Sequence, residues 1–117
     1  VLNNVDTKPE YLERVKMGFK AVLDYDGTGY GYMPDYINPA GKTGTSQSFV
    51  DSDNDGAIDT ETLTNTFIGF APYDNPSVSF AIVSPDVTHY NNGSTYRTAV
   101  NKKISYEVSK KFFEIYQ

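Results

Sequence analysis

A cation, two threonine hydroxyls and two glycines lie together in the polar sequence Gly-Lys-Thr-Gly-Thr-Ser-Gln, which begins at position 41 and could bind an anion. We interpret it as the edge strand of a sheet. Because side chains alternate along a strand, Thr43, Thr45 and Gln47 are predicted to share one face. Lys42 and Gly44 take the other face, and the bare backbone at the glycine would let main-chain N–H groups approach an oxygen that becomes negative during a reaction. A glycine- and threonine-rich turn without function is the alternative that the tripeptide Lys-Thr-Gly leaves open.

Four aspartates follow with the spacing of the front of a calcium-binding loop. Acidic residues occupy positions 1, 3, 5 and 9, with glycine at 6 and an aliphatic residue at 8; they are Asp51, Asp53, Asp55 and Asp59. Position 12, which normally holds a bidentate glutamate, is Thr62. Bound calcium would offset the repulsion between the carboxylates and would be structural. The alternative is a solvated acidic tip of a hairpin insertion over residues 51–62.

Composition and charge exclude several classes of function. The net charge is −5 and no basic stripe is present, which argues against a nucleic-acid partner because such binding requires neutralised phosphates. No cysteine occurs, so no disulfide framework or thiolate metal site is predicted. There is no apolar run of about 18 residues to span a membrane. At 117 residues, the chain is expected to be one small domain or one piece of a larger polypeptide.

Two helices and three strands are predicted to position these residues. Apolar residues at helical spacing indicate a helix over residues 8–23, with Thr7 and Glu10 as a capping box. A loop rich in glycine and tyrosine leads to strands over about 39–50, 63–71 and 77–84, which form an antiparallel meander. The third is apolar enough on both faces for a central position. A helix over about 95–116 carries an apolar stripe that is expected to pack on the sheet: Val100, Ile104, Val108, Phe112 and Ile115.

The strand with Lys-Thr-Gly, together with its neighbours, resembles the C-terminal portion of a class B penicillin-binding protein, a serine D,D-transpeptidase. The resemblance rests on Ala40–Gln47, Phe67–Pro72 and Val78–Pro85, and it extends from about Lys8 onward. It implies an α+β fold of the penicillin-binding and β-lactamase-like type. In that fold an antiparallel sheet of about five strands, three of them in this chain, is covered by helices. The long acidic hairpin favours an enzyme of a Gram-positive bacterium.

The family has three signatures in chain order: Ser-x-x-Lys with the nucleophile and its base, Ser-x-Asn for proton relay, and Lys-Thr-Gly. Only the third is present in its place, and no Ser-x-x-Lys occurs. Ser52-Asp53-Asn54 spells the second signature, but it follows the third and lies in the acidic hairpin, so we interpret it as a coincidence. We expect the nucleophile on an N-terminal part of the same transpeptidase and expect this chain alone to be inactive.

The resemblance implies acyl transfer from peptidoglycan stem peptides that end in D-Ala-D-Ala, which cross-links the cell wall. The hydroxyls of Thr43 and Thr45 would donate to the terminal carboxylate of the peptide, and Lys42 would supply a positive field. The backbone N–H of Thr45 would form half of the oxyanion hole. Gly44 and Gln47 would lie along the substrate. β-Lactam antibiotics would bind as mimics of the same terminus, and no cofactor would take part in the chemistry.

The implied location is the extracytoplasmic face of the cell membrane, with the anchor outside this chain. A serine β-lactamase or β-lactam sensor has a similar strand and is the first alternative. Its acyl-enzyme would differ in how fast it turns over. The second alternative is a secreted calcium-binding module without catalysis, centred on Asp51–Asp59. Uptake of calcium without labelling by penicillin would favour that module.

Overall fold

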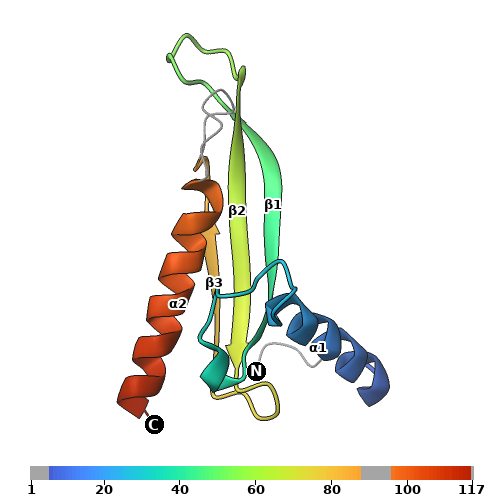
Figure 1. Ribbon diagram of the computed structural model, residues 1–117. Coiled ribbons are helices and arrows are strands. Elements are labelled where there is room, and N and C mark those ends of the chain that lie inside the picture. The colour runs from blue at the N-terminus through green and yellow to red at the C-terminus, as the bar shows by residue number, and fades with distance from the viewer. Residues whose placement is uncertain (1–5, 88–95, 117) are drawn as a thin grey trace.

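The computed structural model describes residues 6–87 and 96–116 and has an α+β fold. A three-stranded antiparallel sheet in the order β1-β2-β3 is flanked by two helices that approach it at different angles (Figure 1). No helix among the described residues is long and apolar enough to cross a membrane. The elements in chain order are α1 (Pro9–Leu23), the 3-10 helix η1 (Asp35–Ile37), β1 (Ala40–Val50), β2 (Thr60–Ala71), β3 (Val78–Ser84) and α2 (Tyr96–Tyr116).

The start of α1 differs from the sequence prediction in how it is capped. Lys8 occupies the cap position in an extended conformation, and no side chain caps the first turn by a hydrogen bond. The predicted capping box of Thr7 and Glu10 is therefore wrong. Pro9 takes the first helical position instead, where its fixed φ suits the helix and its missing N–H costs nothing.

The strand β2 begins at Thr60, three residues before the predicted position 63. Thr62, the twelfth position of the candidate calcium loop, is consequently buried inside the strand, where its hydroxyl donates to the carboxylate of Asp86. It cannot turn back to close a metal cage. The predicted start of the last helix at position 95 lies outside the described residues.

The register of the sheet assigns the side chains of β1 to its two faces. Lys42 pairs with Ile68, Thr43 with Phe67 and Thr45 with Asn65. Residues directly opposite each other in an antiparallel pair point to the same face. The strands β1 and β2 are longer than β3, so their hairpin extends beyond the rest of the sheet (Figure 1).

The position of β3 differs from the expectation for its apolar sequence. Within the described residues it is an edge strand, paired only with β2. Val83 points away from α2 and is 63% exposed. The two further strands that would make β3 central stay a prediction.

The core lies between the sheet and α2 and is centred on Phe67. Its fully buried ring packs against Tyr32, with ring centroids 4.7 Å apart, and against Phe80, at 6.0 Å. Met33 and Phe113 complete the same cluster. Burial of a phenylalanine contributes on the order of 2–3 kcal/mol relative to exposure. The loop after α1 is thereby fixed on the face of the sheet to which Thr43 belongs.

The face of α2 that packs on the sheet is not the predicted apolar stripe. Four residues of that stripe, Val100, Ile104, Val108 and Ile115, are between 38% and 59% exposed, and only Phe112 packs against the core. The buried positions are instead Asn101, Ser105, Ser109 and Phe113.

Short side chains explain how this polar face can pack. The hydroxyl of Ser105 donates to the carbonyl of Asn101, and that of Ser109 donates to the carbonyl of Ser105. Each serine is therefore satisfied within its own helix. The residues then behave as small groups that let the helix approach the strands closely, so the apolar stripe is left facing outward.

The helix α1 contacts the sheet through few of its apolar residues. Phe19 packs edge-on against Phe70 at 6.3 Å between ring centroids, on the face opposite Phe67. Leu12, Val15 and Met17 are at least half exposed. Much of the apolar surface of this helix is therefore unburied within the described chain.

Candidate active-site strand

The outer strand β1 carries the residues that the sequence singled out. On its outer side it has no strand partner among residues 6–87 and 96–116. The observed register puts Thr43, Thr45 and Gln47 on the face of the sheet that includes Phe67, and Lys42 on the opposite face. The predicted alternation of side chains along this strand therefore agrees with the register.

A glycine at position 44 has a local cause in the sheet. A Cβ added to Gly44 would lie 2.3 Å from Oγ1 of Thr66, its cross-strand partner, so the Thr66 hydroxyl would have to move away. Glycine at this position therefore accommodates the Thr66 side chain as it stands, whether or not a ligand approaches the backbone.

The ammonium group of Lys42 supplies a positive charge on this strand. Its side chain is exposed and its Nζ donates to the neighbouring carbonyl of Thr43. No carboxylate among the described residues forms an ion pair with it. Its charge is therefore available to an anion that approaches the strand from solvent.

The two threonine hydroxyls differ in their hydrogen bonds. Oγ1 of Thr45 donates to Oδ1 of Asn65 across the sheet at 3.1 Å, and Asn65 is buried. Oγ1 of Thr43 lies 3.4 Å from Oγ1 of Thr28, which is longer than an ordinary hydroxyl hydrogen bond. A hydroxyl has one proton to donate. The proton of Thr45 is therefore committed, whereas that of Thr43 is held only weakly.

Asn65 and Thr28 were missed by reasoning from the sequence. Asn65 lies on the neighbouring strand, opposite Thr45. This pairing follows from the strand register, which cannot be read from the sequence alone. Thr28 lies in the loop after α1 and reaches Thr43 because the loop crosses the sheet (Figure 1).

Gln47 is also occupied within the hairpin. Its Nε2 donates to Oε1 of Glu61 at 2.6 Å, on the same face as Thr45. A contact between Gln47 and substrate would require this bond to break. Its role in binding substrate stays a prediction.

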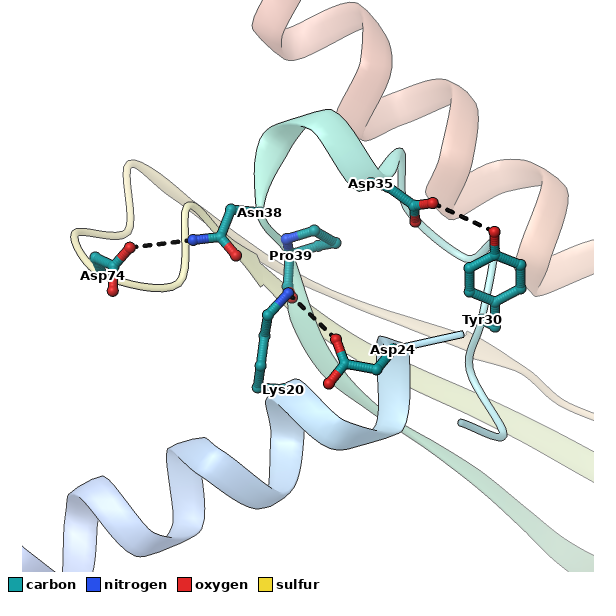
Figure 2. A network of polar contacts seen from close by, with 7 residues as sticks. All are labelled: Lys20, Asp24, Tyr30, Asp35, Asn38, Pro39 and Asp74. Carbon is teal, nitrogen blue, oxygen red and sulfur yellow. Dashed lines mark hydrogen bonds and ion pairs between the residues drawn. The ribbon is translucent and has the colours of Figure 1, made fainter. Parts of the chain in front are cut away.

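A polar network fixes the base of β1 against α1 and the β2–β3 turn (Figure 2). Nζ of Lys20 donates to the carbonyl of Pro39 at 3.3 Å and pairs with Asp24 at 3.5 Å. Nδ2 of Asn38 donates to Asp74 at 3.1 Å. These contacts converge on the residues just before β1, so they restrain the start of the strand that carries Lys42.

A tyrosine and a glutamate also take part in the contact between α1 and the turn that joins β2 to β3. The hydroxyl of Tyr73 donates to Glu13 at 2.8 Å, and Nζ of Lys16 lies 4.9 Å from the centre of the Tyr73 ring. The hydrogen bond from Tyr73, together with the charge of Lys16, holds the pKa of Glu13 below its ordinary value. The turn after β2 is thereby linked to α1.

The acidic hairpin tip brings three of the four predicted calcium ligands together. Carboxylate oxygens of Asp51, Asp53 and Asp55 all lie within 4.8 Å of one another. Asp51 accepts the backbone N–H of Gly56 at 2.8 Å, and this bond is the main cause that lowers its pKa. Asp59 is outside the group, and its carboxylate accepts the hydroxyl of Thr60. Calcium binding stays a prediction, and the geometry limits it to the first three aspartates.

Comparisons with known proteins agree with this architecture. The family model described as the penicillin binding protein transpeptidase domain matches residues 1–106. The chain is 38% identical over 117 residues to penicillin-binding protein 2A of Bacillus subtilis (strain 168), covering 98% of this chain and 16% of that protein. It is 32% identical over 87 residues to penicillin-binding protein H of the same organism, covering 74% of this chain and 12% of that protein.

A solved structure, penicillin-binding protein 2B from Streptococcus pneumoniae (strain R6), shares the fold. The TM-score is 0.65 at 22% identity, over 95% of this chain and 17% of that chain. The chain thus spans about a sixth of the length of the relatives 2A and 2B. By its match to the family model and its likeness to relatives over nearly its whole length, the chain belongs to the penicillin-binding protein transpeptidase domain family.

Proposed function

We propose that this chain supplies the strand that binds the substrate carboxylate in a peptidoglycan D,D-transpeptidase. The carrying observation is an outer strand on which Lys42, exposed and without an ion-pair partner among the described residues, is followed in sequence by Thr43 with its weakly bonded hydroxyl. The substrate would be a stem peptide that ends in D-Ala-D-Ala, and β-lactams would bind as its mimics. The serine nucleophile would come from the N-terminal part of the same polypeptide. The reaction would use no cofactor.

Each residue has a distinct role in this proposal. The Thr43 hydroxyl donates to the terminal carboxylate, and a hydrogen bond to a charged group contributes about 1.5–3 kcal/mol. Lys42 attracts the same anion with an energy of roughly 4 kcal/mol at 4 Å and an effective dielectric near 20, before desolvation and screening reduce it. The backbone N–H of Thr45 stabilises the oxyanion while the serine attacks and D-Ala leaves.

Unburied apolar surface supports the participation of further polypeptide. The outer edge of β3 is unpaired within the described residues, and such edges aggregate unless they are covered. Ile68 and Val83 are exposed on one face of the sheet, and the outward stripe of α2 adds Ile104 and Val108. We assign these surfaces to contact with the N-terminal part of the transpeptidase. The whole protein would act on the extracytoplasmic face of the membrane.

Fluorescent penicillin tests the proposal on the full-length polypeptide. Labelling is expected with the complete protein and not with residues 1–117 alone, since the chain has no Ser-x-x-Lys. Absence of labelling from the complete protein would overturn the proposal. The lifetime of the acyl-enzyme separates the transpeptidase, for which a long lifetime is expected, from a β-lactamase, for which rapid hydrolysis is expected.

A further inference from the structure

A hydroxyl from the loop after α1 lies beside the hydroxyl of Thr43 on β1. Oγ1 of Thr28 is 3.4 Å from Oγ1 of Thr43, and either oxygen could be the donor. Thr28 is exposed and Thr43 is half-buried, so a ligand that approaches from solvent can reach both groups. The loop that carries Thr28 crosses the sheet to reach this position (Figure 1). Two hydroxyls from separate segments therefore meet at one point of the strand.

The position of Thr28 is fixed by contacts of its own loop. The N–H of Gly29 donates to the carbonyl of Val22 at 2.9 Å. A Cβ added to Gly27 would lie 2.1 Å from the same backbone oxygen, so the close approach of the loop to the end of α1 requires glycine there. The N–H of Tyr32 donates to the carbonyl of Gly29 at 3.0 Å, and the ring of Tyr32 is buried in the core. The Thr28 hydroxyl is thus held beside β1 before any ligand arrives.

A carboxylate that binds at Thr43 requires more than one donor. Its two oxygens accept hydrogen bonds and donate none. The proton of Thr45 is committed to Asn65, whereas the contact between Thr28 and Thr43 is longer than an ordinary hydroxyl hydrogen bond. A hydrogen bond to a charged group is stronger than this contact, so both hydroxyls can turn their protons toward an anion at little cost.

We propose that Thr28 is a specificity-determining residue of the transpeptidase, whose hydroxyl donates to one oxygen of the substrate carboxylate while Thr43 donates to the other. This inference rests on the proposed function, because it adds a residue to the carboxylate site described there. It replaces the expectation that Thr45 supplies the second hydroxyl, since that hydroxyl is bonded to Asn65. The loop after α1 thereby takes part in distinguishing a free C-terminal acid from an ester or an amide.

Acylation of the full-length polypeptide by benzylpenicillin and by its methyl ester tests this inference, because the ester keeps the β-lactam ring and lacks the carboxylate. Thr28→Val preserves the shape of the side chain and removes the donor. It should lower the second-order rate constant for benzylpenicillin by about tenfold, the lower end for a hydrogen bond to a charged group, since water competes at an exposed hydroxyl. The rate constant for the ester should stay at the parent value.

Two further variants separate the hydroxyl from the rest of the side chain. Thr28→Ser keeps a donor and should retain most of the parent rate constant for benzylpenicillin. Thr7→Val changes another exposed threonine, which precedes α1, and is the matched control that should react as the parent protein does. In saturation kinetics, the loss in Thr28→Val should appear in the benzylpenicillin concentration that gives half-maximal acylation rather than in the limiting rate.

This inference and the proposed function fail in different ways. If benzylpenicillin does not acylate the parent protein, the proposed function is wrong and this inference is wrong with it. If the parent protein is acylated and Thr28→Val reacts with benzylpenicillin at the parent rate, only this inference is overturned. An equal loss for benzylpenicillin and its ester would also overturn it, because a structural defect does not depend on the carboxylate. Circular dichroism of each variant verifies that it is folded.

Discussion

The unequal hydrogen bonding of Thr43 and Thr45 leads to a quantitative prediction. A hydrogen bond to a charged carboxylate contributes about 1.5–3 kcal/mol. The Thr43 hydroxyl can contribute nearly all of this, because its 3.4 Å contact with Thr28 is weak. The Thr45 hydroxyl must first leave Asn65, which costs about 0.5–1.5 kcal/mol. The net contributions of the two hydroxyls should therefore differ by roughly 1 kcal/mol, or about fivefold in rate.

The assay is the rate constant for acylation of the full-length protein by fluorescent penicillin. Thr43→Val should lower it by about 10- to 150-fold, and Thr45→Val should be about fivefold less damaging. In an Asn65→Ala background the Thr45 proton is released, so the added effect of Thr45→Val should approach that of Thr43→Val. An equal or larger loss for Thr45→Val in the parent protein would refute the reasoning.

Four further predictions concern the core, the helix and the acidic tip. Phe67→Ala should lower the free energy of unfolding by about 3–5 kcal/mol, measured with urea, because the buried ring contacts Tyr32 and Phe80; a loss below about 1 kcal/mol would contradict the core assignment. Ser109→Leu should destabilise by about 1–3 kcal/mol through overpacking, whereas Glu107→Leu on the exposed side of α2 is the control and should have little effect. By NMR, Asp51 should titrate below an ordinary aspartate, because its carboxylate accepts the backbone N–H of Gly56. Its contribution to hairpin stability is therefore present above its unfolded pKa and is lost as pH falls through the lowered folded pKa. An ordinary or raised pKa of Asp51 would contradict this hydrogen bond. If calcium binds the tip, the thermal midpoint should rise with the ion, and Asp53→Asn should abolish the rise.

Local sequence patterns were sufficient to predict those features that depend only on residues close together in the chain. The period of two along β1 correctly separates Lys42 from Thr43 and Thr45, since strand geometry alone decides it. The polar packing face of α2 was not predictable in the same way. The hydroxyls of Ser105 and Ser109 bond to carbonyls of their own helix, so these serines can be buried as small side chains. The spacing of hydrophobic residues, from which the packing face was predicted, does not reveal this. The partnership of Thr45 with Asn65 likewise depends on register, which is a tertiary property.

The acidic hairpin shows a second limit of pattern matching. Its first nine positions fit a calcium loop, but the strand β2 begins at Thr60, so the loop cannot continue to a ligand at position 12. Asp59 was predicted with the other aspartates by spacing alone, and it lies outside their cluster. The two further strands expected beside β3 are not among the described residues, and they stay a prediction of the family resemblance.

The most direct test of the account is the acylation rate of the full-length protein after Lys42→Ala. We predict that the acylation rate falls at least about tenfold. Solvent screening reduces the attraction between the exposed ammonium and the substrate carboxylate below its unscreened value, but at a site that binds an anion this attraction is stronger than that of an ordinary surface charge pair. Lys103→Ala, which removes another exposed lysine on α2, is the matched control and should leave the rate unchanged. An unaltered rate in the Lys42 variant would contradict the claim that this strand binds the substrate carboxylate.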